Sequence, residues 1–266
     1  MRRLIYTLAA VLVLAAPARA ADDPPIRPFP KETVERLGRA IYELDRAAWV
    51  ASDALVAKVP DVKSAHLLGW VIVDSGAGYR VRFLRDAGSG LEAGYDIDVT
   101  PQFKTRLAEP ANRTLTEVEK NMWAARSTAL DGLSGQPTCR PGYNTVVLRD
   151  PEREGWIVWL LAPMPAANVY PIGGHYRFSV SADGRRILQR DALSTSCMTM
   201  DSTAAGPSGD RPAVFGAMHL VSPTPVETHV FVQLQSGKPI MVAAGGRMWG
   251  VDKGKVRDMG VLPPAK

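Results

Sequence analysis

Hydrophobic residues recur at three- and four-residue steps between positions 31 and 59. They are Val34, Leu37, Ile41, Leu44, Ala48, Ala51 and Leu55. This spacing places them on one face of a helix, because an α-helix turns once every 3.6 residues. Pro60 ends the pattern, and Gly38 weakens the helix modestly. The sequence therefore predicts an amphipathic helix over residues 31–59.

The next segment has the two-residue period of β-strands. Residues 67–73 are apolar, 74–78 form a glycine-containing turn, 79–84 alternate between apolar and polar positions, and 91–99 form a third strand. Asp96 and Asp98 share one face of that third strand. We expect them to be solvated and to form ion pairs with Arg80 and Arg82 on the neighbouring strand.

A second helix is predicted from Thr116 to Gly132. Thr116 and Glu119 have the spacing of a capping box, in which each side chain satisfies a backbone N–H at the start of the helix. The buried stripe of this helix consists of Met122, Ala125 and Ala129.

The chain after Cys139 is almost entirely β in pattern. Candidate strands cover residues 143–148, 156–161, 176–180, 187–191, 217–221, 226–234, 240–243 and 248–251. Tight turns, including those at 181–184 and 236–239, favour antiparallel neighbours. The order is a helix, a three-stranded meander, a second helix and then a mostly antiparallel β-rich lobe. This order predicts an α+β fold.

Domain organisation follows from the same pattern. Residues 31–266 form one domain with two lobes, 31–133 and 139–262, and the proline-rich residues 21–30 form an extended leader. Residues 200–212 are small, polar and proline-containing, which predicts a surface loop.

The first twenty residues have the three zones of a secretory signal peptide. Arg2 and Arg3 precede an apolar run over residues 4–16, and Ala18 and Ala20 supply the small residues that a signal peptidase needs. An uncleaved anchor is the alternative, but this run is shorter than the roughly 20 apolar residues of a membrane span. We expect cleavage between Ala20 and Ala21, leaving a mature chain without a membrane span.

Signal removal also changes the charge. The full chain has 32 Lys and Arg residues against 27 Asp and Glu residues, a formal net charge of +5. Arg2, Arg3 and Arg19 leave with the signal, which lowers the net charge to +2. A nearly neutral chain without blocks of like charge gives no reason to expect a nucleic-acid partner.

Two cysteines, Cys139 and Cys197, stand 58 positions apart. An even number of cysteines in an exported chain predicts a disulfide. The alternatives are two buried thiols or one reactive thiol.

No short motif names a reaction. The zinc motif HExxH, the nucleophile motif GxSxG and glycine-rich phosphate loops do not occur. The best local candidates are Glu227 and His229, which project from the same face of the predicted strand 226–234, with His175 as a further candidate. Convergence with His219 would allow a zinc site. The simpler interpretation is a solvated polar face, and no cofactor or metal is assigned.

The chain also contains six tryptophans: Trp49, Trp70, Trp123, Trp156, Trp159 and Trp249. Core packing explains most of them, and a tryptophan-lined groove for a glycan is the alternative.

Several short segments together carry a resemblance. They are residues 173–177, 179–184, Ser196 with Cys197, 227–231 and 237–239. The chain resembles a family of exported proteobacterial proteins with no assigned activity. The resemblance implies a Gram-negative periplasmic location and transfers no functional residue.

Two hypotheses therefore remain. The first is a soluble periplasmic binding or accessory factor without catalytic activity, with an envelope protein or a glycan as its partner. The second is an envelope hydrolase with a dispersed site around Glu227, His229 and His175, in a metal-free or a metal-dependent form.

Overall fold

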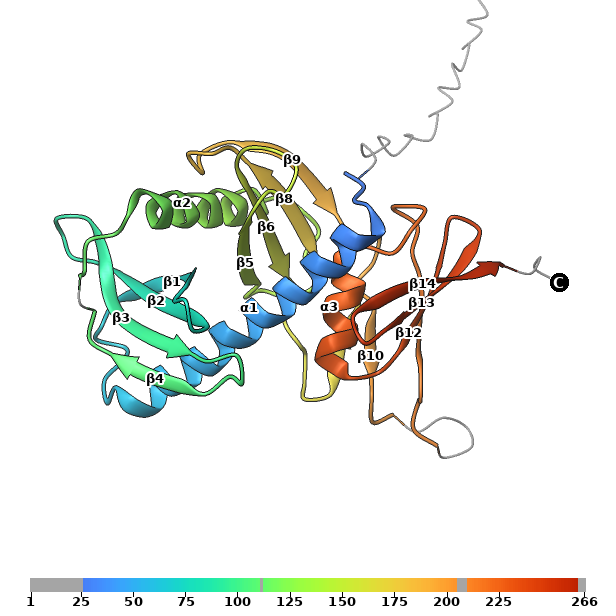
Figure 1. Ribbon diagram of the computed structural model, residues 1–266, viewed down its shortest axis with the longest axis horizontal. Helices are drawn as coiled ribbons and strands as arrows, with labels where there is room; N and C mark the ends of the chain where they lie inside the picture. Colours follow the sequence, from blue (N-terminus) through green and yellow to red (C-terminus); the bar gives the residue numbers. More distant parts are fainter. Residues whose placement is uncertain (1–25, 111, 205–209, 263–266) are drawn as a thin grey trace, which may run out of the picture.

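The computed structural model describes residues 26–110, 112–204 and 210–262. The predicted signal peptide, its Ala20–Ala21 cleavage site and the first half of the predicted leader lie outside this part. The described residues form an α+β fold of three helices and several mainly antiparallel sheets, as predicted (Figure 1). None of the helices in these ranges combines the length and apolarity that crossing a membrane requires.

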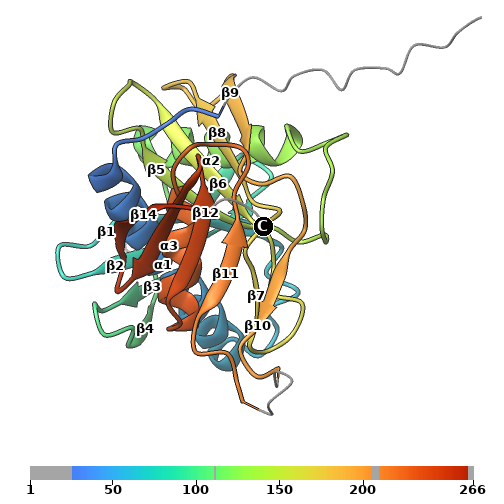
Figure 2. The same ribbon diagram turned by 90° about the vertical axis from the view of Figure 1, so that its right-hand side faces the viewer.

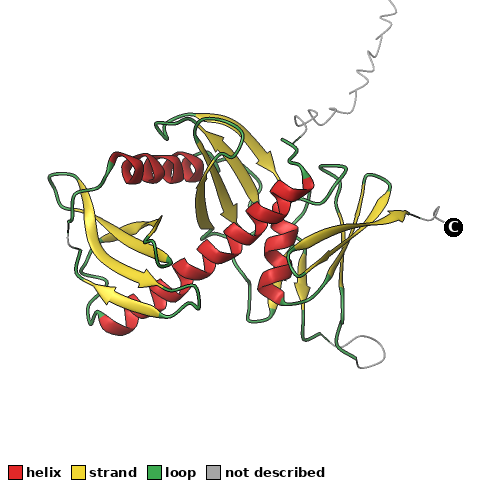
Figure 3. Ribbon diagram, viewed as in Figure 1, coloured by secondary structure: helices red, strands yellow, loops and turns green. Residues whose placement is uncertain are grey.

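Helix α1, Lys31–Lys58, is the long helix expected from the hydrophobic period. Its N-terminal half packs into a core shared with the C-terminal elements, through residues such as Leu37 and Ile41. Its C-terminal half packs through Ala51 and Leu55 against the N-terminal sheet. One helix therefore contributes to cores on both sides of the molecule (Figure 3). The division into lobes 31–133 and 139–262 stays a prediction.

The N-terminal sheet is an antiparallel meander of four strands. Its strands are β1 Leu67–Asp74, β2 Tyr79–Asp86, β3 Leu91–Val99 and β4 Thr105–Ala108, in that order. The first three match the prediction, and β4 was not predicted.

The two predicted ion pairs of this sheet are present, but one of them is buried. Arg80 lies 2.8 Å from Asp98 near the surface. Arg82 lies 3.0 Å from Asp96 and 2.9 Å from Glu119, and all three side chains are buried. The expectation of solvated charges is wrong for the Arg82 pair, because the start of helix α2 covers it.

Helix α2, Glu117–Asp131, begins with the predicted capping box. The Thr116 side chain accepts a hydrogen bond from the Glu119 backbone N–H, and the Glu119 carboxylate accepts one from the Thr116 backbone N–H. Glu119 thus caps its own helix and also pairs with Arg82, which ties α2 to the N-terminal sheet.

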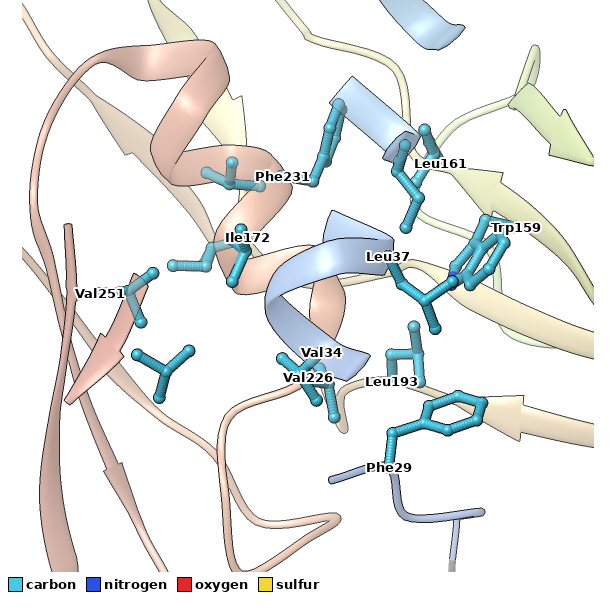
Figure 4. Close-up of a cluster of buried hydrophobic side chains, with 14 of the residues drawn as sticks. Phe29, Val34, Leu37, Trp159, Leu161, Ile172, Leu193, Val226, Phe231 and Val251 are labelled. Carbon is cyan, nitrogen blue, oxygen red and sulfur yellow. The ribbon is translucent and has the colours of Figure 1, made fainter. Parts of the chain in front are cut away.

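The central sheet contains β5 Asn144–Arg149, β6 Trp156–Leu161, β8 Tyr176–Val180 and β9 Ile187–Ala192. Every residue of β6 is buried, because α2 covers one face of the sheet and α1 with α3 covers the other. Successive side chains of a strand point to opposite faces. Trp156 therefore packs toward α2, and Trp159 packs toward α1 and α3 (Figure 4).

A short ribbon formed by β7, Val169–Pro171, and β10, Thr199–Asp201, lies beside this sheet. Neither strand was predicted. The predicted loop over residues 200–212 is wrong at its start, because Met200 and Asp201 belong to β10. Residues 205–209 lie outside the described part.

The C-terminal elements form a β–α–β unit followed by two antiparallel strands. They are β11 Phe215–Met218, α3 Glu227–Ser236, β12 Ile240–Ala244, β13 Arg247–Asp252 and β14 Lys255–Val261. Strands β11 and β12 are parallel, and α3 connects them. The predicted strand 217–221 is thus observed earlier in the chain, as β11.

The predicted strand 226–234 is wrong, because this segment is helix α3. Its first seven residues, 227–233, are all buried. A helix that is buried on all sides shows no amphipathic period, so its β-branched residues produced a false strand pattern. The predicted hairpin turn at 236–239 is the end of this helix, where Gly237 takes a left-handed conformation with φ of 68°.

The described part of the predicted leader packs into the core. Phe29 is buried among hydrophobic residues of the central core (Figure 4). Ile26 belongs to the same core, and Arg27 is buried as well. The segment is extended, but it is an integral part of the fold.

The predicted disulfide is present. Cys139 and Cys197 are bonded, with their Cα atoms 5.5 Å apart. The bond joins the loop before β5 to the loop between β9 and β10, which explains why the described chain holds no free thiol.

Candidate functional site

Glu227 is the first residue of helix α3 and is completely buried. Its Oε1 accepts a hydrogen bond from Trp159 Nε1 at 2.7 Å. Both of its carboxylate oxygens accept from Arg177 Nη1, at 2.9 and 3.1 Å. The carboxylate is therefore held by an indole and a guanidinium.

Arg177 connects this carboxylate to the N-terminal segment. It comes from β8 and donates to Asp191 on β9 at 2.6 and 2.9 Å. The same guanidinium donates to the backbone carbonyl of Arg27 and lies 4.7 Å from the Phe29 ring. Both carboxylates and the guanidinium are at most 2 % exposed. A buried arginine with two acidic partners and a cation–π contact stabilises an interior junction.

Arg27 extends the network toward the surface. Its guanidinium pairs with Asp150 and, at 2.8 Å, with Glu152. These hydrogen bonds hold the pKa of Arg27 above its usual range, and the pKa of Asp150 lies below its own even though burial opposes this. The network fastens residues 26–29 to the central sheet.

His229 is the third residue of α3 and acts as a cap. Its Nδ1 accepts a hydrogen bond from the Val226 backbone N–H at 3.1 Å, which satisfies a donor at the start of the helix. Burial, followed by the nearness of His219, lowers the pKa of His229 to about 3. The imidazole is neutral at pH 7, and its Nε2 has no hydrogen-bond partner within the described ranges.

His219 follows β11 and stacks edge-on against His229. The ring centroids are 4.8 Å apart, and the ring planes are inclined at 85°. His219 Nε2 lies 2.8 Å from Ser222 Oγ, which itself donates to the Thr224 carbonyl. The serine must therefore accept, so Nε2 of His219 carries the proton. Burial lowers the pKa of His219 to about 4, although Glu227 opposes the shift.

His175 is held by two backbone groups. Its Nδ1 accepts from the Ala162 N–H at 3.0 Å, and its Nε2 lies 3.0 Å from the Pro171 carbonyl, to which it donates. Burial lowers its pKa to about 4. Both ring nitrogens are used, and the ring edge packs on Phe231, so this histidine joins strands rather than binding a ligand.

The predicted grouping of Glu227 with His229 does not form. The two residues lie on a helix, where positions i and i+2 point in widely different directions, and no hydrogen bond joins them. His219 and His229 instead line a small pocket of about 20 Å³ with Ser194, Ser196 and Met198. A pocket of this size accommodates about one water molecule.

Sequence reasoning did not single out Arg177 or Asp191, and it considered His219 beside His229 only as part of a zinc site. Arg177 stands between Tyr176 and Phe178 in a predicted strand, so its side chain lies on the opposite face from theirs, and no local signal marks that face as buried. Helices α1 and α3 cover that face of the central sheet and bury it. A buried guanidinium needs acidic partners. The chain around Arg177 offers one such partner, Asp191, within the adjacent hairpin strand.

A catalytic zinc site requires three protein ligands. Across residues 26–110, 112–204 and 210–262, no group of three or more His, Cys, Asp or Glu side chains is arranged to hold a metal ion. The pair of His219 and His229 offers two imidazoles.

The chain matches no protein-family description, no curated protein and no solved structure.

Proposed function

We propose that the protein is an exported, soluble binding or accessory factor of the periplasm without catalytic activity. Residues 1–20 support export by their sequence pattern, and the Cys139–Cys197 disulfide is compatible with an oxidising compartment. An envelope protein or a glycan would be its partner.

The proposal depends on one observation: all three candidate catalytic side chains already form hydrogen bonds within the fold. Glu227 accepts hydrogen bonds from Trp159 and Arg177, His175 uses both ring nitrogens on backbone groups, and His229 caps a helix. A general base must be within hydrogen-bond reach of the proton that it removes. A pocket with room for about one water molecule leaves no space for a substrate beside these groups.

One observation favours the alternative, an envelope hydrolase. His229 Nε2 makes no hydrogen bond to the described residues, and its ring lines the small pocket beside His219. Because Nδ1 accepts from the Val226 N–H, Nε2 of the neutral ring carries the proton, so it would meet a substrate as a hydrogen-bond donor; removal of a substrate proton would need the other tautomer and the loss of the cap. A metal-dependent version of the hydrolase would need a third ligand in addition to the two imidazoles.

Replacement of His229 by Gln separates the two functions. Glutamine at the third position of a helix accepts the same capping hydrogen bond, so the variant keeps the cap and loses the imidazole. We expect His229→Gln to restore function in a strain that lacks the chromosomal gene as fully as the native chain does. Loss of rescue by a variant whose circular dichroism and melting temperature match the native protein would favour the hydrolase.

Export is tested separately. We expect the intact mass of the protein recovered from the periplasmic fraction to correspond to a chain that begins at Ala21. A cytoplasmic protein that still carries Met1 would contradict the proposed location.

A further inference from the structure

The outer face of the C-terminal sheet carries four of the nine methionines of the chain. The inner face packs on α3 through residues such as Ile240, Val242 and Val251. The outward positions include Met218 on β11, Met241 on β12, Met248 on β13 and Met259 on β14. None of these four side chains belongs to a buried hydrophobic cluster, and Met218 and Met259 are 72 % and 60 % exposed. Figure 2 shows this sheet in front of α3 and α1.

The sheet register places small residues between these methionines. Met241 lies opposite Gly216 on one neighbouring strand and opposite Gly250 on the other. Met218 and Met248 lie on either side of Ala243 in the next row. A side chain at Gly216 would meet open space, so the long thioethers have room to move across the face. Glycine within a strand often marks a place where a ligand approaches the backbone closely.

Two of the sulfur atoms lie over Gly250. A Cβ atom built on Gly250 would lie 3.5 Å from the Sδ of Met259, 3.6 Å from its Cγ and 3.9 Å from the Sδ of Met241. Both sulfurs are thus within 4 Å of one point above the sheet. Methionine is unbranched and has several rotatable bonds, so small rotations bring such sulfurs onto a shared ion.

We propose that this methionine face binds a soft monovalent metal ion, copper(I) or silver(I), through the thioethers of Met241 and Met259, with Met218 and Met248 as the adjacent ligands. Thioether sulfur is a soft ligand that selects copper(I) over hard ions such as magnesium and calcium. The proposal deepens the binding role proposed above by naming a ligand class, and it rests on that role only for its biological setting.

The rest of the chain offers few competing soft ligands. Both cysteines are in the disulfide, so no thiolate is available. His175, His219 and His229 are buried, whereas His66 is exposed. Arg257 lies opposite Gly250 on the methionine face, but its charge is exposed to water. Water around this guanidinium screens its repulsion of a bound cation.

Titration of the full mature chain with silver(I) tests the site without redox chemistry. The titration is followed by calorimetry in a chloride-free buffer, with the disulfide intact. We expect saturable binding of one silver ion, accompanied by shifts of the methionine methyl signals in NMR spectra. The double variant Met241→Leu with Met259→Leu keeps the apolar surface and removes both sulfurs, so its affinity should fall by about tenfold or more.

Two control variants locate the binding. Met164→Leu removes an exposed thioether elsewhere, and His66→Gln removes the exposed imidazole; both should bind silver as the native chain does. Silver binding that survives in the double variant, that disappears in His66→Gln, or that is absent from the native chain would overturn the proposal. If the face instead bound an apolar protein segment, the Met-to-Leu changes would leave that binding unchanged, because leucine keeps the apolar surface. None of these results depends on export or on His229, so the proposed function is judged independently.

Discussion

The three buried histidines predict a loss of stability on mild acidification. Burial holds the pKa of His175 and His219 at about 4 and that of His229 at about 3. A histidine in the unfolded chain has a pKa of roughly 6.5. As the pH falls below that value, the unfolded chain binds protons that the folded chain does not. The free energy of unfolding therefore decreases as the pH falls.

The magnitude follows from these pKa values. Between pH 7 and pH 5, each histidine lowers the free energy of unfolding by about 1.9 kcal/mol, and the three together by about 5–6 kcal/mol. Asp45 acts in the opposite direction, because burial raises its pKa to about 6. Its protonation favours the folded state by about 1.3 kcal/mol over the same range. The net loss of about 4 kcal/mol is a large part of the roughly 5–15 kcal/mol of an ordinary domain.

Urea unfolding at pH 7 and pH 5, followed by tryptophan fluorescence, measures this difference. The series stops at pH 5 because ordinary carboxylates begin to take up protons below it. His229→Gln should reduce the loss of stability between pH 7 and pH 5 by about 1.9 kcal/mol, nearly half of the net value, since it removes one of the three histidines while Asp45 remains. His66→Gln is the matched control, because this histidine is exposed.

Equal stability at pH 7 and pH 5 would refute the reasoning. It would mean that the histidines take up protons in the folded state at ordinary pH, and hence that the region around His219 and His229 is open to water. NMR titration of the imidazole protons distinguishes this outcome directly.

Two further substitutions test the packing around the site. Gly38→Ala should lower the free energy of unfolding by about 1–3 kcal/mol, because the new Cβ would lie 2.5 Å from Val230 Cβ and 2.6 Å from the Glu227 carbonyl oxygen. This clash outweighs the gain of about 1 kcal/mol that alanine gives a helix over glycine. Thermal unfolding measures the difference, and a raised melting temperature would contradict the close contact of α1 and α3. Glu227→Gln should lower the free energy of unfolding by about 3 kcal/mol, because Arg177 would remain buried with Asp191 as its single carboxylate partner. An unchanged midpoint of urea unfolding would show that the network contributes little to stability.

Local patterns in the sequence were sufficient for much of the framework. The three- and four-residue spacing from Val34 to Leu55 predicted α1, because that helix has one buried face. The Thr116–Glu119 spacing predicted the start of α2, since a capping box involves only neighbouring residues. The pairing of Cys139 with Cys197 followed from there being two cysteines in a chain for which the sequence predicts export.

The tertiary structure alone decided what lies around Glu227 and His229. A hydrophobic pattern distinguishes a helix from a strand most clearly where one side faces water, because a short segment that is buried on all sides is apolar in either conformation. Residues 227–233 are covered on all sides, so their pattern predicted a strand where the chain forms a helix.

The same cause explains the buried arginines: the sequence pattern predicted a solvated ion pair for Arg82, and it assigned no role to Arg177. Arg82 and Arg177 stand at polar positions of alternating strands, and a second layer of structure covers both. Once covered, each guanidinium requires carboxylates that come from other elements, as Glu119 and Glu227 do. Such contacts depend on which elements pack together, and this information is spread over the whole chain rather than held in any one segment.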